Sequence, residues 1–388
     1  ATSTLDYIAS LSLFADLFYY VIGMVACLGL RRKLPDLKRP FKVRGMVPGA
    51  VISIVIYLVM MTQLDTDALV TGVIYCVVGL VIYAVCAKKY GTRAIDVNAV
   101  QDTSEPTPDE RAKMDREFHI WIAAAAIGAA AAGYLFLIAP GRSRAGQRFP
   151  FRGQNIAHRG LYDAAQGIPE NSLAAFRAAA EGGYGAELDT RLTKDGVVVV
   201  SHDSNIRRMT GADVTVESLD YAELQRYKLG GTEERVPRFS DALDILAAAH
   251  VPVIVEVKAS PDHRRGELCR KVLEIIDAHT GNFCVESFDP FIVAWFRFHA
   301  PDLLRGQLTA QRDNLGGKLG AWLSSRMLIG CIGRPQFIAH RTGKKSLGVK
   351  LAELLGAMRV TWTAHDRSEE AKCDTVIFEA YRPPVQYK

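Results

Sequence analysis

The stretch "NIAHRGLYDAAQGIPENSLAAFRAAAEGGYGAELDTRLT" (residues 155–193) contains a short apolar run, a helix-like segment and a second apolar run in succession. We predict strands at 155–159 and 185–192, with a helix at 172–181 between them. A strand, a helix and a parallel strand in this order form the repeating unit of parallel α/β folds.

The same alternation continues through the remainder of the chain. Further strands are predicted at 197–202, 252–258, 283–288, 304–308, 336–340 and 359–363, and further helices at 240–249, 264–278, 290–299 and 348–356. Most of these eight strands are followed by a helix, which is typical of a TIM (β/α)8 barrel, an α/β fold. Functional side chains are therefore expected at the C-terminal ends of the strands, where this fold places its active sites.

Two of the predicted strands carry charged side chains two residues apart. Glu187 and Asp189 lie in "AELDT", and Glu256 and Lys258 lie in "VEVK". Residues i and i+2 of a strand point to the same face, and buried charges are costly unless they are paired or bind something. Three carboxylates suit a hard divalent cation such as Ca²⁺ or Mg²⁺. A solvated edge strand or a salt-bridged pair would also explain these residues.

Two histidines follow predicted strands at the same expected edge. His158 precedes Arg159 in "AHRG", and His202 ends the run "VVVVSH". An imidazole with a pKa near about 6.5 can give or accept a proton at neutral pH, and a guanidinium can bind two phosphate oxygens. With Lys258 as a second cation, the set suits a phosphodiester, because one histidine can activate the nucleophile and the other can protonate the leaving alkoxide. Zinc held by the histidines is the alternative metal site, and a structural role is the alternative for each histidine taken alone.

The region 157–211 resembles the signature of the glycerophosphodiester phosphodiesterase family. The matching segments are "HRG", "PENSLAAF", "ELDTRLTKDG", "VVSHD" and "RMTG", followed by "VEVK", "ESF" and "WT", so that the resemblance spans about 155–382. It implies a TIM barrel that hydrolyses glycerophosphodiesters to glycerol 3-phosphate and an alcohol with the help of Ca²⁺ or Mg²⁺.

The resemblance also implies a role for each matching residue. The acid–base pair would be His158 and His202, the metal ligands Glu187, Asp189 and Glu256, the phosphate contacts Arg159 and Lys258, and the substrate pocket Glu170, Phe288 and Trp362. Asn171 or Ser172 would cap the helix that follows, and the glycerol 2-hydroxyl of the substrate would serve as an internal nucleophile. Only eleven residues separate Trp362 from "DTVIFE", which predicts a short last barrel helix.

Long apolar runs precede the barrel region. They cover 7–30, 46–64, 68–87 and 120–139, and each is close to the roughly 20 residues that span a bilayer core. We expect an all-α transmembrane region of about four helices, with permease-like helices at 1–90, a polar linker at 91–118, a further transmembrane helix at 119–140 and the barrel at 150–388. No secretory signal peptide is expected.

The segment "LRRKLPDLKRPFKVRG" (30–45) resembles a cytoplasmic loop between helices of amino acid permeases of the amino acid–polyamine–organocation class. The resemblance covers about the first 90 residues and lacks the substrate-binding helices of such carriers, so it implies no transport by this segment alone. Basic loops mark the cytoplasmic side of a membrane, and counting spans from this loop places the barrel outside the cytoplasm. The arginines after the fourth run argue for the opposite side, namely Arg142, Arg144, Arg148 and Arg152.

Composition excludes two other classes of protein. The net charge is +5, but seven basic residues lie in the single loop 31–44 between apolar runs, which does not indicate nucleic-acid binding. The seven cysteines form no CxxC pair and no cluster with histidines at zinc spacing, so neither a disulfide framework nor a structural zinc site is expected.

Together these features predict a membrane-anchored, metal-dependent glycerophosphodiester phosphodiesterase of the plasma membrane, with a slight preference for an extracytoplasmic barrel. The bilayer and a water-soluble glycerophosphodiester are the expected partners. One alternative is phospholipase D-like hydrolysis of lysolipids on the same barrel. Another is a non-catalytic transporter accessory bound to a membrane carrier, but the complete set of acid–base and metal-binding residues argues against an inert barrel.

Overall fold

A computed structural model describes the chain at residues 16–17, 19–21, 23–25, 53, 109, 134–259, 264–311, 323 and 325–387. The chain divides into two compact units, 1–107 and 108–388. Apart from the few residues named between 16 and 109, the predicted permease-like helices, the linker and most of the fourth apolar run lie outside the described residues. Within the described ranges, no helix is both long enough and apolar enough to cross a bilayer.

Eight parallel strands of the described residues close into a barrel, which confirms the predicted TIM fold of the catalytic region. They are β1 (Gln154–Ala157), β2 (Gly185–Leu192), β4 (Val253–Val257), β5 (Phe283–Ser287), β6 (Leu304–Thr309), β7 (Phe337–Arg341), β8 (Met358–Ala364) and β9 (Thr375–Phe378). The barrel closes because β1 pairs with β2 on one side and with β9 on the other. Each of the eight is parallel to its barrel neighbours.

One predicted barrel strand was wrong. The run at 197–202 forms β3 (Val198–Val200), which pairs with β2 in the antiparallel direction and stands outside the barrel. The chain reverses in the turn before it, where Gly196 has a φ of +80°, a conformation that glycine adopts without strain. The missing eighth barrel strand is β9, which sequence analysis did not count as a strand.

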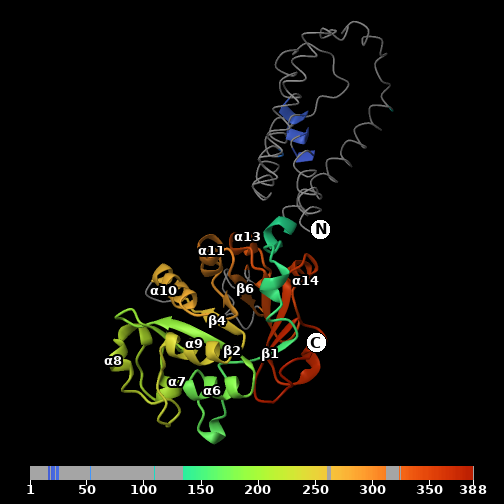
Figure 1. The fold of residues 1–388 in the computed structure, drawn as a ribbon. Coiled ribbons are helices and arrows are strands. Elements are labelled where there is room, and N and C mark those ends of the chain that lie inside the picture. Colours follow the sequence, from blue (N-terminus) through green and yellow to red (C-terminus); the bar gives the residue numbers. More distant parts are fainter. Residues whose placement is uncertain are drawn as a thin grey trace. The chain divides into compact units, whose positions relative to one another are not determined.

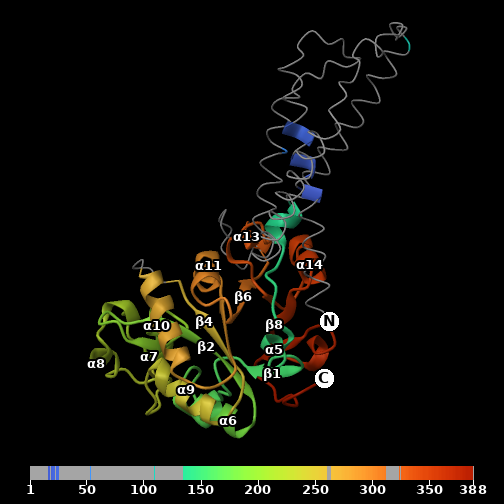
Figure 2. The ribbon, with the colours of Figure 1, turned by 45° about the horizontal axis from the view of Figure 1, so that its top comes forward.

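Helices lie outside the strands and return the chain from one strand to the next (Figure 1 and Figure 2). The five longest match the predicted helices within two residues: α6 (Leu173–Glu181), α9 (Phe239–Ala248), α10 (Arg265–Asp277), α11 (Pro290–His299) and α14 (Leu347–Leu354). The shorter ones are α5 (Ala145–Arg148), α7 (Arg207–Thr210), α8 (Tyr221–Leu224), α13 (Gly330–Gly333), and the 3-10 turns η2 (Ala164–Gln166), η3 (Val216–Ser218) and η5 (Arg367–Glu369). The turn η5 is the short last helix that was predicted.

The core has two layers that follow the alternation of the strands. Side chains such as Ile156, Ile254 and Val360 fill the inside of the barrel, whereas Leu188 and Val255 pack between the barrel and the helices. Because successive strand residues alternate between these layers, a residue two positions beyond an inward-facing one also faces inward. This rule decides which charged residues reach the mouth of the barrel.

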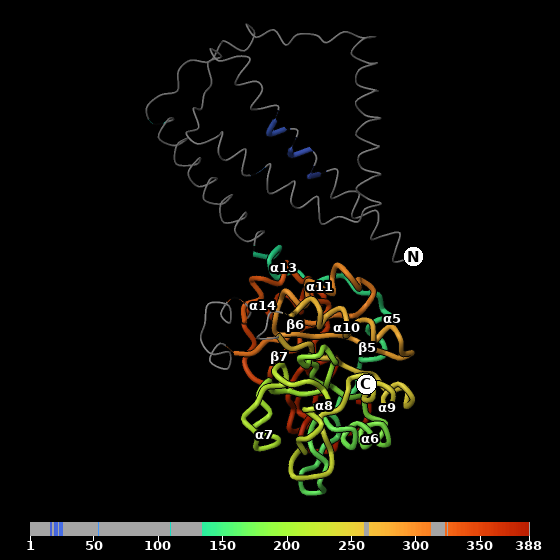
Figure 3. The backbone as a smooth tube through the Cα atoms, turned by 90° about the vertical axis from the view of Figure 1, so that its left-hand side faces the viewer, coloured from blue at the N-terminus to red at the C-terminus, as the bar shows by residue number. Residues whose placement is uncertain are grey.

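The chain between β2 and α9 makes a long excursion with a small core of its own. Six buried apolar residues form this core, namely Val199, Ile206, Val216, Leu224, Leu229 and Val236. The helices α7 and α8 belong to this excursion and lie apart from α13 and α14 in every view (Figure 1, Figure 2 and Figure 3). The excursion therefore adds a separate wall beside the barrel.

The described end of the fourth apolar run packs on the barrel domain. Residues 134–138 are helical, and Ile138 is fully buried in a cluster with Ile338 and Val349. Near the C-terminus of the chain, Gln386 forms a bridge with Gln154 at the start of β1, so the C-terminal residues cover part of the side on which the barrel strands begin.

Candidate active site

The first site residues follow β1 in a tight turn. Arg159 and Gly160 have φ values of 56° and 78°, and a Cβ atom on Gly160 would stand 2.8 Å from the Cβ of Ala175. Only glycine fits this close approach to α6. The turn directs the backbone N–H of Arg159 to donate to Glu187 Oε2 at 3.1 Å, so the strand end is built around the carboxylates of β2.

Three predicted metal ligands come together at the mouth of the barrel. Oxygen atoms of Glu187, Asp189 and Glu256 lie within 4.8 Å of one another, and all three residues are buried. Adjacent parallel strands bring them together, since Asp189 of β2 is the register partner of Glu256 of β4. The predicted phosphate contact Lys258 lies among them, with its Nζ atom 2.8 Å from both Asp189 Oδ1 and Glu256 Oε2.

The three carboxyl groups differ in the direction of their pKa shifts. Burial raises the pKa of Glu187 well above its usual range, and the charge of Asp189 raises it further. Burial also raises the pKa of Asp189, but Lys258 and His202 outweigh it and hold this pKa well below its usual range. Burial raises the pKa of Glu256 to about 7 although Lys258 opposes this shift. Crowded carboxylates of this kind repel one another, and a hard divalent cation with oxygen ligands relieves the repulsion. The residues therefore fit a Ca²⁺ or Mg²⁺ ion.

His158 is held by a carboxylate that sequence analysis missed. Its Nδ1 atom is 2.9 Å from Glu379 Oε2, and its Nε2 atom faces Glu187 Oε2 at 3.9 Å. The hydroxyl of Tyr162 donates to the other oxygen of Glu379. The hydrogen bond from His158 is the main cause that lowers the pKa of Glu379 to about 2, so this carboxylate is ionised at neutral pH and fixes the ring from behind.

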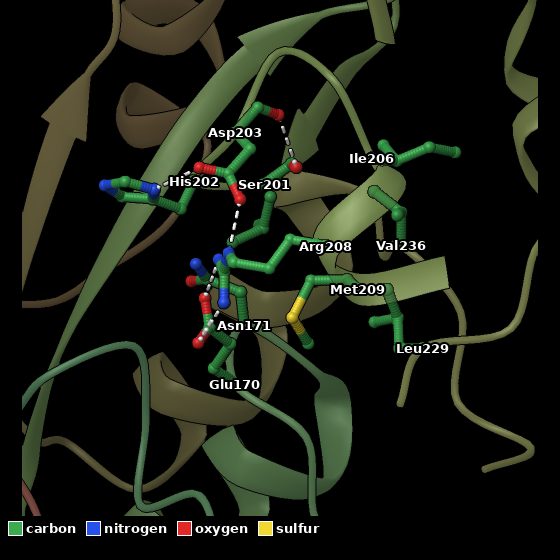
Figure 4. A pocket seen from close by; sticks show the side chains of 11 residues that line it. Glu170, Asn171, Ser201, His202, Asp203, Ile206, Arg208, Met209, Leu229 and Val236 are labelled. Atoms are coloured by element: carbon green, nitrogen blue, oxygen red, sulfur yellow. Dashed lines mark hydrogen bonds and ion pairs between the residues drawn. The ribbon is translucent and has the colours of Figure 1, made fainter. Parts of the chain in front are cut away.

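His202 is held in a similar way by the residue that follows it. Its Nδ1 atom is 2.7 Å from Asp203 Oδ1, and Arg208 donates to Asp203 Oδ2 at 2.6 Å. Figure 4 shows this chain of contacts continuing from Arg208 to Glu170, at a small pocket that His202 and Asn171 also line. Burial lowers the pKa of His202, which favours the neutral imidazole.

Glu170 and Asn171 form hydrogen bonds with charged side chains of the site. Glu170 accepts from Arg159 at 2.7 Å and from Arg208 at 2.6 Å, so it positions two cations beside the site. Asn171 donates to Asp189 Oδ2 at 2.8 Å. The helix cap is Ser172, whose hydroxyl accepts from the backbone N–H of Ala175, which settles the choice that the sequence left open between Asn171 and Ser172.

The two predicted aromatic pocket residues meet on another part of the rim. The rings of Phe288 and Trp362 are 5.6 Å apart in an edge-to-face arrangement, and both pack on the interior of the barrel. The indole N–H of Trp362 donates to the carbonyl oxygen of Ala339 at 3.1 Å, which fixes the ring. The guanidinium of Arg341 lies 6.0 Å from the Trp362 ring centroid.

Sequence analysis gave no role to three residues of this site: Asp203, Arg208 and Glu379. A signal existed for two of them, because Asp203 directly follows His202 and Glu379 follows the apolar run "TVIF". Arg208 lies on α7, six residues beyond His202, and no local pattern marks it.

The arrangement as a whole is that of a barrel hydrolase: two oriented imidazoles and two cations surround a carboxylate cluster that fits a divalent ion. Residues 158–379 match the glycerophosphoryl diester phosphodiesterase family. The chain belongs to this family.

Curated relatives match the chain over shorter segments. The chain is 34% identical over 139 residues to a protein of Rattus norvegicus named lysophospholipase D GDPD1, a match that covers 32% of this chain and 41% of that protein. It is 35% identical over 111 residues to a glycerophosphodiester phosphodiesterase of Caldanaerobacter subterraneus subsp. tengcongensis, covering 27% of this chain and 44% of that protein. The chain thus spans less than half the length of these relatives.

Solved structures share the barrel. One is a phosphodiesterase of Oleispira antarctica in complex with the product sn-glycerol-3-phosphate, with a TM-score of 0.50 and 21% identity over 60% of this chain and 94% of that one. Another is a putative glycerophosphoryl diester phosphodiesterase of Silicibacter pomeroyi, with a TM-score of 0.50 and 24% identity over 63% of this chain and 93% of that one. At this identity the likeness supports the fold alone.

Proposed function

We propose that this chain hydrolyses glycerophosphodiesters to glycerol 3-phosphate and an alcohol. The observation that carries the proposal is the position of His158 and His202 beside one buried carboxylate cluster, each with its Nδ1 atom held by a carboxylate. His158 faces Glu187, and His202 lines the same cleft as Lys258, which contacts Asp189 and Glu256. Each ring therefore directs Nε2 away from its own support, so that the two nitrogens are available for proton transfer.

The proposed reaction uses the charged groups in distinct roles. Arg159 and Lys258 bind the phosphodiester oxygens, because they are the cations nearest the carboxylate cluster. One histidine takes the proton of the nucleophile, a water or the glycerol 2-hydroxyl, and the other gives a proton to the leaving alkoxide. The new bond to phosphorus forms as the bond to the alcohol oxygen breaks. If water is the nucleophile, the product is glycerol 3-phosphate directly. If the glycerol 2-hydroxyl is the nucleophile, the first product is a cyclic phosphodiester, and a water then opens the ring to give glycerol 3-phosphate with the two histidines in exchanged roles. Bound at Glu187, Asp189 and Glu256, a divalent cation would stabilise the charge on the phosphoryl group.

A polar cleft supports a water-soluble substrate. His202 and Lys258 line one open cleft whose other lining residues are also polar or charged, namely Arg191, Asp203, Ser204, Asn205, Arg207, Arg208 and Asp213. No apolar side chain lines it within the described part of the chain. A small polar alcohol group fits such a cleft better than a hydrocarbon chain does.

The first test is the release of glycerol 3-phosphate by the full chain from glycerophosphocholine and glycerophosphoethanolamine. We expect release with Ca²⁺ or Mg²⁺, loss of release with EDTA, and recovery when the metal is restored. Equal activity in EDTA would contradict the role of the metal. A folded chain that releases no glycerol 3-phosphate with any metal would contradict the diesterase activity.

Hydrolysis of lysophospholipids is the second candidate, favoured by the rat relative named lysophospholipase D. The same preparation is incubated with lysophosphatidylcholine, and choline and lysophosphatidate are measured. Faster turnover of this lipid than of glycerophosphocholine would replace the first proposal with the second.

We further propose that the chain is an integral protein of the plasma membrane with its barrel on the extracytoplasmic side. The apolar runs between residues 7 and 139 and the basic loop 31–44 support this placement. The chain is expected to stay in the membrane fraction after alkaline carbonate extraction, and added protease is expected to cleave the barrel in intact cells. Release by carbonate would contradict the anchoring, and protection from protease would reverse the orientation.

Glu379 provides a further prediction. Replacing Glu379 with Gln keeps the shape but removes the charge behind His158, so kcat is expected to fall by about 10²-fold through misplacement of the ring, while KM changes little. The Glu379→Asp variant is expected to recover part of kcat. The matched control is Glu233→Gln, since the Glu233 side chain is 83% exposed and pairs with Lys228 at the surface. A wild-type kcat in Glu379→Gln would contradict the positioning role of Glu379.

A further inference from the structure

The mouth of the barrel buries more negative charge than its own cations can balance. Four carboxylates are at most 7% exposed, namely Glu187, Asp189, Glu256 and Glu286. Two cations accompany them at low exposure, Arg159 and Lys258. When all four carboxyl groups are ionised, four negative charges against two positive charges leave an excess of two negative charges, which is the charge that one divalent cation balances.

Glu286 is the member of this group without a role so far. It is the register partner of Glu256 on the neighbouring parallel strand, and such partners point to the same face at a strand spacing of about 4.8 Å. The residues two positions before and after Glu286 show that this face is the inside, because Cys284 of β5 belongs to the interior cluster and Phe288, just after β5, packs against it. Glu286 therefore points into the barrel beside Glu256.

One oxygen of the Glu286 carboxylate has no hydrogen-bond partner among the described residues. This oxygen, Oε2, is buried. The Nζ atom of Lys258, a cation of the same cluster, contacts Asp189 and Glu256. A buried charge without a partner is costly unless it binds something, and an unmet acceptor that faces a carboxylate cluster points to a cation.

We propose that Glu286 is the fourth carboxylate of the cation site, beyond the three whose oxygens already lie together. The inference rests on the proposed use of a divalent cation. Glu286 supplies the charge that makes four carboxylates, two protein cations and one divalent ion neutral together. Such an oxygen-rich site suits Ca²⁺, which accepts six to eight oxygen ligands.

The test compares Glu286→Gln with the wild-type full chain in the absence of substrate. Ca²⁺ affinity, measured by titration calorimetry, is expected to fall at least about 10-fold. Without metal, the variant is expected to melt at a temperature at least as high as that of the wild type, because Glu286 has an oxygen without a partner there and repels Glu256 when both are ionised. Saturating Ca²⁺ is expected to raise the melting temperature of the wild type more than that of the variant, so the difference between their melting temperatures shrinks or reverses.

Two more variants complete the design. Glu274→Gln removes an exposed carboxylate of α10 that pairs with Arg270 and is expected to match the wild type in both measurements. Glu286→Met removes the carboxylate without adding a buried amide. It is expected to show the same loss of Ca²⁺ affinity and replaces Glu286→Gln if that variant folds poorly. Wild-type Ca²⁺ affinity in a folded Glu286 variant would overturn the inference.

The outcome also separates this inference from the proposed function. If the wild type binds Ca²⁺ and releases glycerol 3-phosphate while the Glu286 variants bind equally well, only the role of Glu286 is overturned. If the wild type binds no Ca²⁺, both the fourth carboxylate and the calcium dependence are overturned, and the EDTA assay decides whether hydrolysis needs a metal at all.

Discussion

Replacing His202 with alanine is expected to lower kcat for glycerophosphocholine by about 10³-fold, because one of the two proton-transfer groups is lost. The fold should survive, since Asp203 keeps its contact with Arg208 and the His202 side chain is 34% exposed. Ca²⁺ binding should also persist, because the three clustered carboxylates are unchanged. The measurement is initial-rate kinetics together with a thermal melt.

The matched control is His299→Ala. His299 is exposed at the C-terminal end of α11 and stacks on Trp295, away from the barrel mouth. It is expected to keep the wild-type rate. A loss of less than 10-fold in His202→Ala, with this control unchanged, would remove His202 from the proposed proton transfer.

Replacing Asp189 with alanine is expected to abolish hydrolysis and to lower the free energy of unfolding by about 3 kcal/mol. Asp189 is 1% exposed and contacts the ammonium of Lys258 and the amide of Asn171 at 2.8 Å each. Its removal leaves Lys258 with Glu256 as its remaining close carboxylate and leaves the amide of Asn171 without this acceptor. Urea unfolding, followed by circular dichroism, measures the stability change.

Asp213→Ala is the control for the loss of an aspartate. Asp213 pairs with Arg207 at 3.6 Å, and the two side chains are 68% and 71% exposed, so the expected change in stability is within about 0.5 kcal/mol. Comparable destabilisation of the two variants would show that Asp189 has no special place in the structure.

Strand period and motif spacing were enough to predict the barrel and most of the site. Glu187, Asp189 and Glu256 could be predicted to share the mouth of the barrel because functional side chains gather at the C-terminal ends of its strands. Their direct adjacency could not, because the strand predicted at 197–202 stood between their two strands. His158 and His202 could be predicted to join them because both follow strands. These inferences need only local sequence and the geometry of the fold.

Contacts between residues that are far apart in the chain could not be predicted from local sequence. The four valines before His202 have the composition of a barrel strand, yet the turn at Gly196 reverses the chain and pairs them antiparallel to β2. The strand β9 has only four residues, so its apolar pattern is too short to stand out. Glu379 follows β9, and its contact with His158 joins residues that lie 221 positions apart in the chain.

The excursion between β2 and α9 carries His202, whereas His158 and the carboxylate cluster belong to the barrel. Its six-residue core is separate from the main cluster. Small cooperative units of this kind can open without global unfolding. Catalysis is therefore expected to fail at a lower denaturant concentration than the barrel, and the amide hydrogens of the excursion should exchange before those of the parallel strands. Survival of the barrel alone would be a poor indicator of a working enzyme.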